Sequence, residues 1–186
     1  LQEQIVARER EFNMRPVLPA FAGHVPTALK RVYPNIKTTR VSEWGGFADQ
    51  YRCTFLNPMD SLYAIIQKEY LTEQTRLYGT NHIYGIDPFN EIDPPSWDAD
   101  SLGMMAKHIY ESVAAVDPEA VWLQMTWLFY ADIKHWTTPR IKSYLRSVPQ
   151  DRLILLDYFC EYTEIWKQTD SYFCLLYTSP SPRDRG

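Results

Sequence analysis

The sequence has little that would favour a metal, a nucleic acid or a membrane as its partner. Its three cysteines, Cys53, Cys160 and Cys174, are odd in number and widely spaced, so they form no metal-type pair and leave the redox compartment undecided. The net charge is −4 and the Lys and Arg residues are scattered, which removes the electrostatic basis for binding nucleic acid. No run of about 18 apolar residues occurs, so no membrane span is expected.

Processing and cofactor signals are missing as well. There is no Asn-x-Ser/Thr sequon, and the chain starts at Leu1, inside an expected helix and without a Met, so it resembles an internal piece in which a signal peptide could not appear. His82, His108 and His135 show no ligand spacing, so we expect no metal and no cofactor. Aromatic residues are abundant at 15% of the chain, and although such rings often stack on sugars, most of them must belong to the core.

Apolar runs alternate with helical patterns along the chain. Four apolar runs predict buried parallel strands, at residues 17–21, 82–87, 120–125 and 153–157. The segments before and between them favour helices, namely residues 2–12, 26–33, a helix capped by Asp60 or Ser61 and stopped by Gly79, a helix ended by Pro118, and a helix capped by Thr138 and opened by Pro139. Residues 35–58 are expected to be irregular.

This alternation predicts an α/β fold built from crossover units. Four strands are about half of a (β/α)8 TIM barrel, and 186 residues are fewer than the roughly 250 that a whole barrel needs. We therefore expect a partial barrel of about four parallel strands. The strand ends carry polar or aromatic residues, and in a barrel these ends form the active-site face. These residues are Asp87 and Glu91 for the second predicted strand, Gln124 and Trp127 for the third, and Asp157 and Glu161 for the fourth.

Glu91 is the strongest catalytic candidate, because Phe89-Asn90-Glu91 places a carboxyl group where a predicted strand ends. Glycoside cleavage needs one carboxyl to protonate the leaving oxygen and a second to attack or to activate water. A partly buried, aromatic-lined strand end could raise the pKa of such a donor. The alternative for Glu91, favoured by spacing alone, is a solvated or salt-bridged side chain.

A second carboxylate is harder to find. Asp87 shares a strand face with Glu91, but four extended residues span roughly 13 Å, whereas a retaining pair needs about 5–5.5 Å and an inverting pair about 6.5–9.5 Å. If the strand stays extended, Asp87 is therefore not the partner. Asp157 and Glu161 could face the same pocket, although a structural role for them is the more economical interpretation.

Several stretches resemble one family. They are residues 1–10 (LQEQIVARER), 17–26 (VLPAFAGHVP), 82–91 (HIYGIDPFNE) and 119–123 (EAVWL). They resemble the lysosomal alpha-N-acetylglucosaminidases of glycoside hydrolase family 89, in order from residue 1 to about residue 173. The resemblance implies that residues 1–173 are the central part of a TIM-barrel catalytic domain. Residues 174–186 are then a disordered or artefactual tail, because their Ser/Pro/Arg-rich sequence departs from the family and resembles translated adapter sequence.

The resemblance also implies roles for individual residues. Glu91 would be the acid/base of a retaining, exo-acting enzyme that removes terminal alpha-linked N-acetylglucosamine from glycans of the heparan sulfate type, without a cofactor and in the lysosome. Asn90, Trp44, Trp127 and His24 would bind the substrate, although each Trp could be core and His24 could cap the following helix. The family's nucleophile lies downstream of the matched region, so this piece alone is expected to be inactive. The alternative is a non-catalytic sugar-binding or structural barrel fragment.

Overall fold

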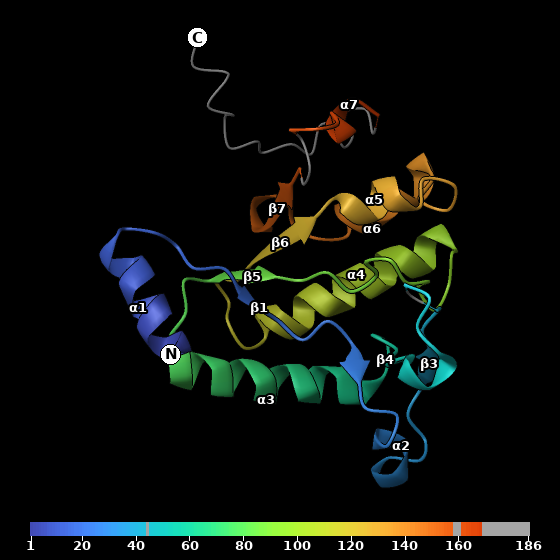
Figure 1. Ribbon diagram of the computed structural model, residues 1–186, viewed down its shortest axis with the longest axis horizontal. Coiled ribbons are helices and arrows are strands. Elements are labelled where there is room, and N and C mark those ends of the chain that lie inside the picture. The colour runs from blue at the N-terminus through green and yellow to red at the C-terminus, as the bar shows by residue number, and fades with distance from the viewer. Residues whose placement is uncertain (44, 158–160, 169–186) are drawn as a thin grey trace.

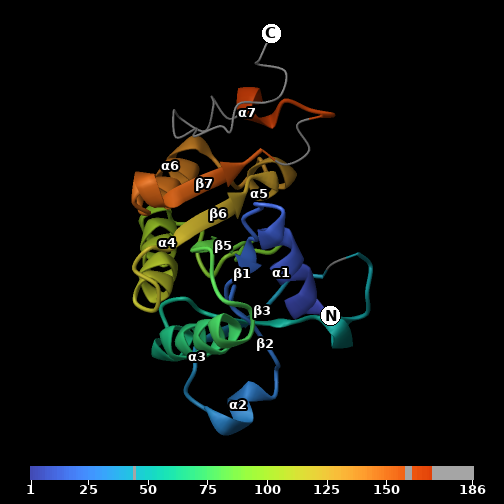
Figure 2. The same cartoon turned by 90° about the vertical axis from the view of Figure 1, so that its left-hand side faces the viewer.

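A four-stranded parallel sheet organises the chain. The computed structural model describes residues 1–43, 45–157 and 161–168. The strands are β1 (Leu18–Pro19), β5 (Ile83–Gly85), β6 (Val121–Met125) and β7 (Leu153–Leu156), which lie side by side in that order (Figures 1 and 2). All three pairings are parallel. The predicted half-barrel arrangement of parallel strands is therefore confirmed, although each strand is shorter than expected.

Long helices connect the parallel strands. Helix α3 (Ser61–Tyr78) precedes β5, α4 (Ala99–Ala114) joins β5 to β6, and α6 (Thr138–Arg146) lies between β6 and β7. Helices α4 and α6 pack closely because Gly103 has no side chain: a Cβ there would lie 2.6 Å from the Ser143 hydroxyl.

The helix ends follow the sequence signals in most places. Asp60 caps α3 by accepting a hydrogen bond from the Leu62 amide at 2.9 Å, and Gly79 ends the helix with a φ of 67°. Asp98 caps α4 in the same way, through the Ser101 amide. The prediction that Thr138 caps α6 is wrong, because Thr138 is the first helical residue.

A second sheet was not predicted. Strands β2 (His24–Val25), β4 (Thr54–Leu56) and β3 (Thr38–Arg40) form an antiparallel sheet in the order β2–β4–β3. Two of these strands lie within the range expected to be irregular, and three residues are too few to show a period-two pattern. The remaining elements are α1 (Gln2–Glu11), α2 (Leu29–Val32), η1 (Asp49–Tyr51), α5 (Trp127–Ala131), η2 (Gln150–Arg152) and α7 (Ile165–Gln168).

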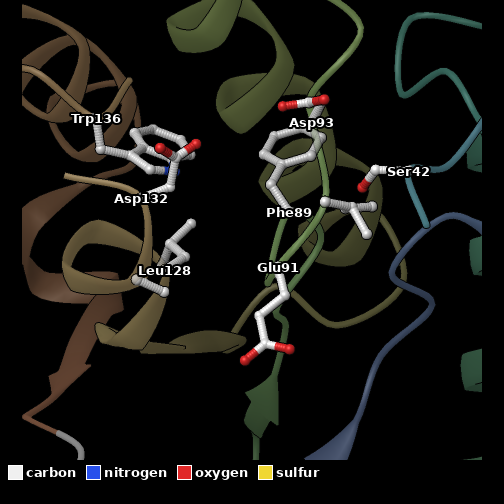
Figure 3. Close-up of a pocket in the computed structure, with 9 residues that line it drawn as sticks. Ser42, Phe89, Glu91, Asp93, Leu128, Asp132 and Trp136 are labelled. Carbon is white, nitrogen blue, oxygen red and sulfur yellow. The ribbon is translucent and has the colours of Figure 1, made fainter. Parts of the chain in front are cut away.

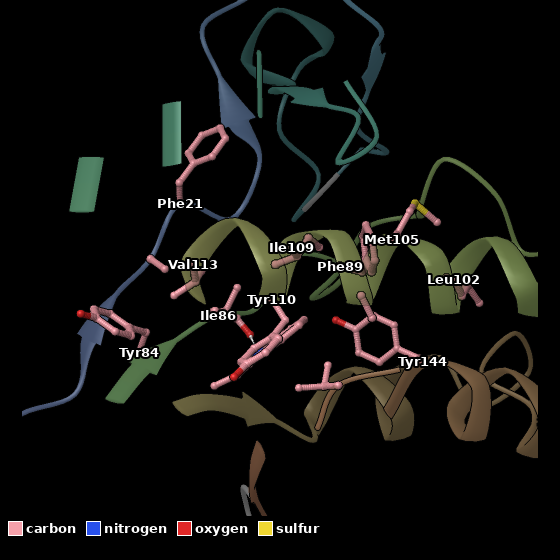
Figure 4. Close-up of a cluster of buried hydrophobic side chains, with 14 of the residues drawn as sticks. Phe21, Tyr84, Ile86, Phe89, Leu102, Met105, Ile109, Tyr110, Val113 and Tyr144 are labelled. Carbon is pink, nitrogen blue, oxygen red and sulfur yellow. Dashed lines mark hydrogen bonds between the residues drawn. The ribbon is translucent and has the colours of Figure 1, made fainter. Parts of the chain in front are cut away.

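The main core lies between the parallel sheet and the helices α4 and α6. Side chains of α4 point toward residues of β5 and its following loop, and Tyr144 of α6 lies beside Phe89 (Figure 4). Trp122 of β6 is buried, and its indole N–H donates to the carbonyl of Ile86 at 2.7 Å. Burial of each such large side chain stabilises the fold by roughly 1.5–3 kcal/mol. This core fixes the carboxyl ends of β5 and β6, where the candidate residues lie.

Candidate active site

Glu91 lies in a tight turn that follows β5. The strand ends at Gly85, and residues 88–91 form the turn. Glu91 has a φ of 54°, a left-handed conformation that is uncommon for a residue with a side chain. Such strain persists where the surrounding structure imposes it, and it often occurs at functional sites.

The Glu91 carboxylate has a partner from the neighbouring strand. The indole N–H of Trp127, the first residue of α5 after β6, donates to Glu91 Oε1 at 2.9 Å. The bond orients the Glu91 carboxylate toward the start of α5. Glu91 is exposed in this chain, so the partly buried setting expected for it is not what the described residues provide.

The carboxyl group of Asp87 has a raised pKa. Burial raises its pKa to about 6; the hydrogen bond from the Gln124 amide opposes this shift, and the negative charge of Glu91 adds to it. The strand does not stay extended as far as Glu91, because β5 ends at Gly85 and residues 88–91 form a turn, so the condition that excluded Asp87 as a partner does not hold. The turn leaves the two carboxyl groups electrostatically coupled.

A buried hydrogen-bond chain holds Asp87. Gln124 Nε2 donates to Asp87 Oδ1 at 2.9 Å, and the Tyr144 hydroxyl donates to Gln124 Oε1 at 3.2 Å. Gln124 and Tyr144 are both buried, and burial raises the pKa of Tyr144 well above its usual value, so its hydroxyl stays protonated. Two strands and a helix therefore fix the position of one carboxyl.

A cavity of about 390 Å³ adjoins Glu91 (Figure 3). Its walls come from the turn after β5, from α5 with the loop that follows it, and from Ser42 of a separate segment. The lining residues are Ser42, Phe89, Glu91, Ile92, Asp93, Leu128, Ala131, Asp132 and Trp136. The side chains of Glu91 and Asp93 leave the turn in opposite directions (Figure 3). The cavity combines apolar and aromatic surface with three carboxylates, and ligand sites commonly combine apolar lining with a few polar groups.

Asn90 lies partly buried beside Glu91. Its Oδ1 atom is buried and accepts no hydrogen bond within the described part of the chain. A buried acceptor without a donor costs free energy, so an atom that supplies one would be bound favourably. Asn90 itself is not among the residues that line the cavity.

Of the two tryptophans predicted to bind substrate, the structure describes only Trp127. Trp127 lies next to Glu91, and its indole N–H is donated to the Glu91 carboxylate, as described above. Its ring packs against Tyr130, with centroids 5.5 Å apart. Trp44 lies outside the described residues.

His24 is placed differently from the prediction. It belongs to β2 of the antiparallel sheet, not to the end of the first parallel strand, and it does not cap α2, whose N-cap is Ala28. Its ring packs edge-on against Phe55, which in turn packs against Phe89 with centroids 5.6 Å apart. Burial lowers the pKa of His24. The cavity lining does not include it.

Sequence reasoning missed most residues of the cavity wall, among them Asp132 and Trp136. Asp132 and Trp136 follow α5, a helix of five residues that is too short to show a helical period and was not predicted. Asp132 pairs with His135 Nδ1 at 2.8 Å, and His135 stacks on Trp97. The cluster of aromatic and charged residues after residue 126 was the sequence signal that could have indicated them. Asp157 and Glu161 do not line the cavity.

Metal-binding clusters and membrane-spanning helices are two further features that bear on the class of site. Within residues 1–43, 45–157 and 161–168, no group of three or more His, Cys, Asp or Glu side chains is arranged to hold a metal ion. Over the same described ranges, none of the helices combines the length and the apolar composition that crossing a bilayer requires.

Comparison with known families assigns the chain. The sequence model of the alpha-N-acetylglucosaminidase (NAGLU) TIM-barrel domain matches residues 1–178. The chain belongs to this family. Human alpha-N-acetylglucosaminidase is 43% identical over 173 residues, which are 92% of this chain and 23% of the human protein. The resemblance to glycoside hydrolase family 89 is confirmed, and the chain spans less than a quarter of the length of that relative.

Solved structures agree on the fold. The family 89 glycoside hydrolase from Clostridium perfringens in complex with PUGNAc superposes with a TM-score of 0.72 at 21% identity, over 89% of this chain and 18% of that one. The same enzyme with two Glu-to-Gln substitutions, in complex with its substrate GlcNAc-alpha-1,4-galactose, gives a TM-score of 0.72 at 20% identity over the same shares. At this identity the likeness establishes the fold alone, which is part of the alpha-N-acetylglucosaminidase barrel.

Proposed function

We propose that this chain is the central part of an exo-acting, retaining glycosidase that removes terminal alpha-linked N-acetylglucosamine, with Glu91 as its acid/base. The observation that carries the proposal is the Glu91 carboxylate, which follows a parallel strand, borders a cavity and accepts the Trp127 indole N–H. Family membership supports the reaction class.

The proposed mechanism gives Glu91 two tasks. In the first step its carboxylic acid protonates the glycosidic oxygen while a carboxylate nucleophile attacks the anomeric carbon. In the second step the Glu91 carboxylate removes a proton from the water that hydrolyses the glycosyl-enzyme. The nucleophile belongs to a segment outside this chain, as the family resemblance implies. The 186-residue chain alone is therefore proposed to be inactive.

The substrate proposal rests on relatives and on Asn90. A relative of this fold is named in complex with GlcNAc-alpha-1,4-galactose, and another complex contains 2-acetamido-1,2-dideoxynojirmycin. Asn90 would accept a hydrogen bond from the sugar near the reacting bond, where such contacts strengthen in the transition state. Trp127, which contacts Glu91 but is not among the residues that line the cavity, remains a proposed binding residue, as do Trp44 and His24. The natural substrate is proposed to be a heparan sulfate-type glycan, degraded in the lysosome.

Glu91→Gln in the complete protein tests the acid/base role. Gln retains an oxygen that can accept the Trp127 indole N–H, so the fold should persist while the proton donor is lost. Turnover of a natural glycan should fall by about 10²–10⁴-fold. An aryl glycoside with a good leaving group needs little protonation, so its glycosylation step should suffer much less and the covalent intermediate should accumulate.

The control for this experiment is Glu119→Gln, which changes an exposed glutamate before β6 and should leave both substrates unaffected. Equal losses on both substrates for Glu91→Gln, without a trapped intermediate, would contradict the acid/base role. The runner-up function is a non-catalytic sugar-binding fragment. It would be favoured if the complete protein bound N-acetylglucosamine but turned over neither substrate.

A further inference from the structure

The short helix α5 ends in a turn that holds the Asp132 carboxylate in the cavity wall. The backbone carbonyl of Asp132 accepts the amides of His135 and Trp136 at 3.1 and 2.9 Å. The ring Nδ1 of His135 lies 2.9 and 2.8 Å from the two carboxylate oxygens of Asp132. Asp132 lines the cavity and His135 does not. The carboxylate is therefore fixed by a side chain that leaves the cavity free.

His135 is itself held in place. Its ring stacks on Trp97, in the loop before α4, with centroids 5.0 Å apart, and its carbonyl accepts a hydrogen bond from the Arg140 guanidinium of α6 at 2.7 Å. The adjacent Trp136 is 2% exposed and packs against Trp97 and Tyr144, with centroids 5.4 Å from each. A solvated surface carboxylate needs no such support, whereas a binding side chain depends on it for its geometry.

The position of the cavity indicates which part of a substrate it would hold. Asn90 and Trp127, which are proposed to bind the substrate, do not line it, although one precedes Glu91 in the chain and the other donates to its carboxylate. In Figure 3 the Glu91 carboxyl lies at one end of the group of lining residues, and Asp132 and Trp136 lie away from it. An acid that protonates a glycosidic oxygen lies between the two sugars that this oxygen joins. If the terminal sugar contacts Asn90 and Trp127, the cavity is left for the other sugar.

We propose that this cavity receives the leaving sugar, to which the terminal N-acetylglucosamine is linked, and that Asp132 accepts hydrogen bonds from its hydroxyl groups. The inference rests on the proposed function, since it takes Glu91 as the acid/base. Asp132 is then a specificity-determining residue, and His135 is a positioning residue that acts through it.

The chemistry of the wall matches a sugar ring. A carboxylate offers about four lone-pair positions on its two oxygens, so the contact with His135 leaves acceptor capacity for hydroxyl groups. A hydroxyl bound to a carboxylate forms a charge-assisted hydrogen bond, roughly twice as strong as a neutral one. Phe89, Leu128 and Trp136 supply apolar and aromatic surface in the same cavity, against which the C–H face of a pyranose can pack.

Asp132→Ala in the complete protein tests the inference with two substrates. One is a disaccharide of N-acetylglucosamine alpha-linked to a hexose, and the other is an aryl alpha-N-acetylglucosaminide, whose leaving group carries no sugar hydroxyl. For the disaccharide, kcat/KM should fall by roughly 10–100-fold, mainly through KM, because the contact exists in both the ground state and the transition state. The aryl glycoside should be unaffected.

Conservative variants and a control guard against a merely structural effect. Asp132→Asn keeps one carbonyl acceptor and should lose less on the disaccharide than Asp132→Ala. His135→Ala should reproduce the pattern of Asp132→Ala on a smaller scale, and His135→Gln, whose amide can still donate, should restore part of the loss. Glu111→Ala removes a carboxylate that pairs with Lys107 on the surface of α4, and it should leave both substrates unaffected.

Two results would overturn the inference. Equal losses on both substrates in the folded Asp132 variants would mean that Asp132 supports the structure or binds the terminal sugar. An unchanged KM for the disaccharide would mean that the leaving sugar does not contact Asp132.

Failure of the inference is distinguishable from failure of the proposed function. If Glu91→Gln shows the leaving-group signature while the Asp132 variants treat the disaccharide as the parent does, the acid/base role stands and the assignment of the cavity is wrong. If Glu91→Gln lacks that signature, the proposed function fails and the inference fails with it.

Discussion

At the scale of single residues, the turn after β5 positions the proposed acid/base. Glu91 adopts a left-handed conformation there, and the turn leaves Asp87 under the influence of its charge. The chain is not extended between Asp87 and Glu91, because Pro88 follows Asp87 and begins the turn at residues 88–91. Proline fixes its own φ and favours the second position of a turn, so the sequence already contained the signal that the strand ends here.

Asp87 should also make stability depend on pH. Its pKa is about 6 in the folded chain and about 3.9 when unfolded, so the folded state holds the proton more tightly. The free energy of unfolding should therefore fall as pH rises from about 4 to about 6 and stay level above that. Each pKa unit corresponds to about 1.4 kcal/mol, so the loss is roughly 3 kcal/mol at most.

Asp87→Asn should remove this loss. In the complete protein the variant should melt at a higher temperature than the parent at pH 7 and at nearly the same temperature at pH 4. Melting curves at the two pH values provide the measurement. A variant that is destabilised equally at both would show that the ionisation of Asp87 carries no penalty.

At the scale of elements, prediction succeeded where a pattern was long enough to repeat. Helices α3 and α4 run for four turns or more between an Asp cap and a clear stop, and the parallel strands are continuous apolar runs. The antiparallel sheet was missed because its strands have two or three residues and pair through long-range contacts. Helix α5 was missed because it has only five residues, too few to show a helical period, and because Thr126 alone separates it from β6.

Asp60 links helix α3 to the antiparallel sheet. One carboxylate oxygen caps α3 through the Leu62 amide, and the other accepts the amide of Lys37, just before β3, at 2.7 Å. Asp60→Ala should therefore cost about 2 kcal/mol, about 1 for the cap and about 1 for the second hydrogen bond. Asp98→Ala removes an exposed cap from α4 and should cost about 1 kcal/mol.

Denaturant unfolding of the complete protein would compare the two cap variants. Asp60→Asn, which retains one good acceptor, should fall between the parent and Asp60→Ala. Equal losses for Asp60→Ala and Asp98→Ala would show that the link to β3 contributes nothing beyond the cap.

At the scale of the whole molecule, the sheet and the site share one property: each is one part of a larger arrangement. Within the described residues, β1 and β7 each pair with a single neighbour. The candidate site likewise contains the proposed proton donor Glu91 and its hydrogen-bond partner Trp127, while the nucleophile is proposed to come from another segment. The family's barrel explains both, because its active site is assembled at the ends of several strands.

The open edges predict how the 186-residue chain should behave when it is produced alone. An unpaired strand is a template for pairing with another chain. Pro19 weakens this tendency at β1 because it has no N–H to donate, whereas β7 is an apolar edge strand whose Leu156 is 42% exposed. We therefore expect poor solubility, association through β7 and a broad thermal transition, measured by size-exclusion chromatography and calorimetry. Leu156→Lys, which places a charge on that edge, should reduce the association without restoring a sharp transition. A monomeric parent chain with a sharp two-state melt would contradict the prediction, because it would mean that this part of the barrel completes its own core.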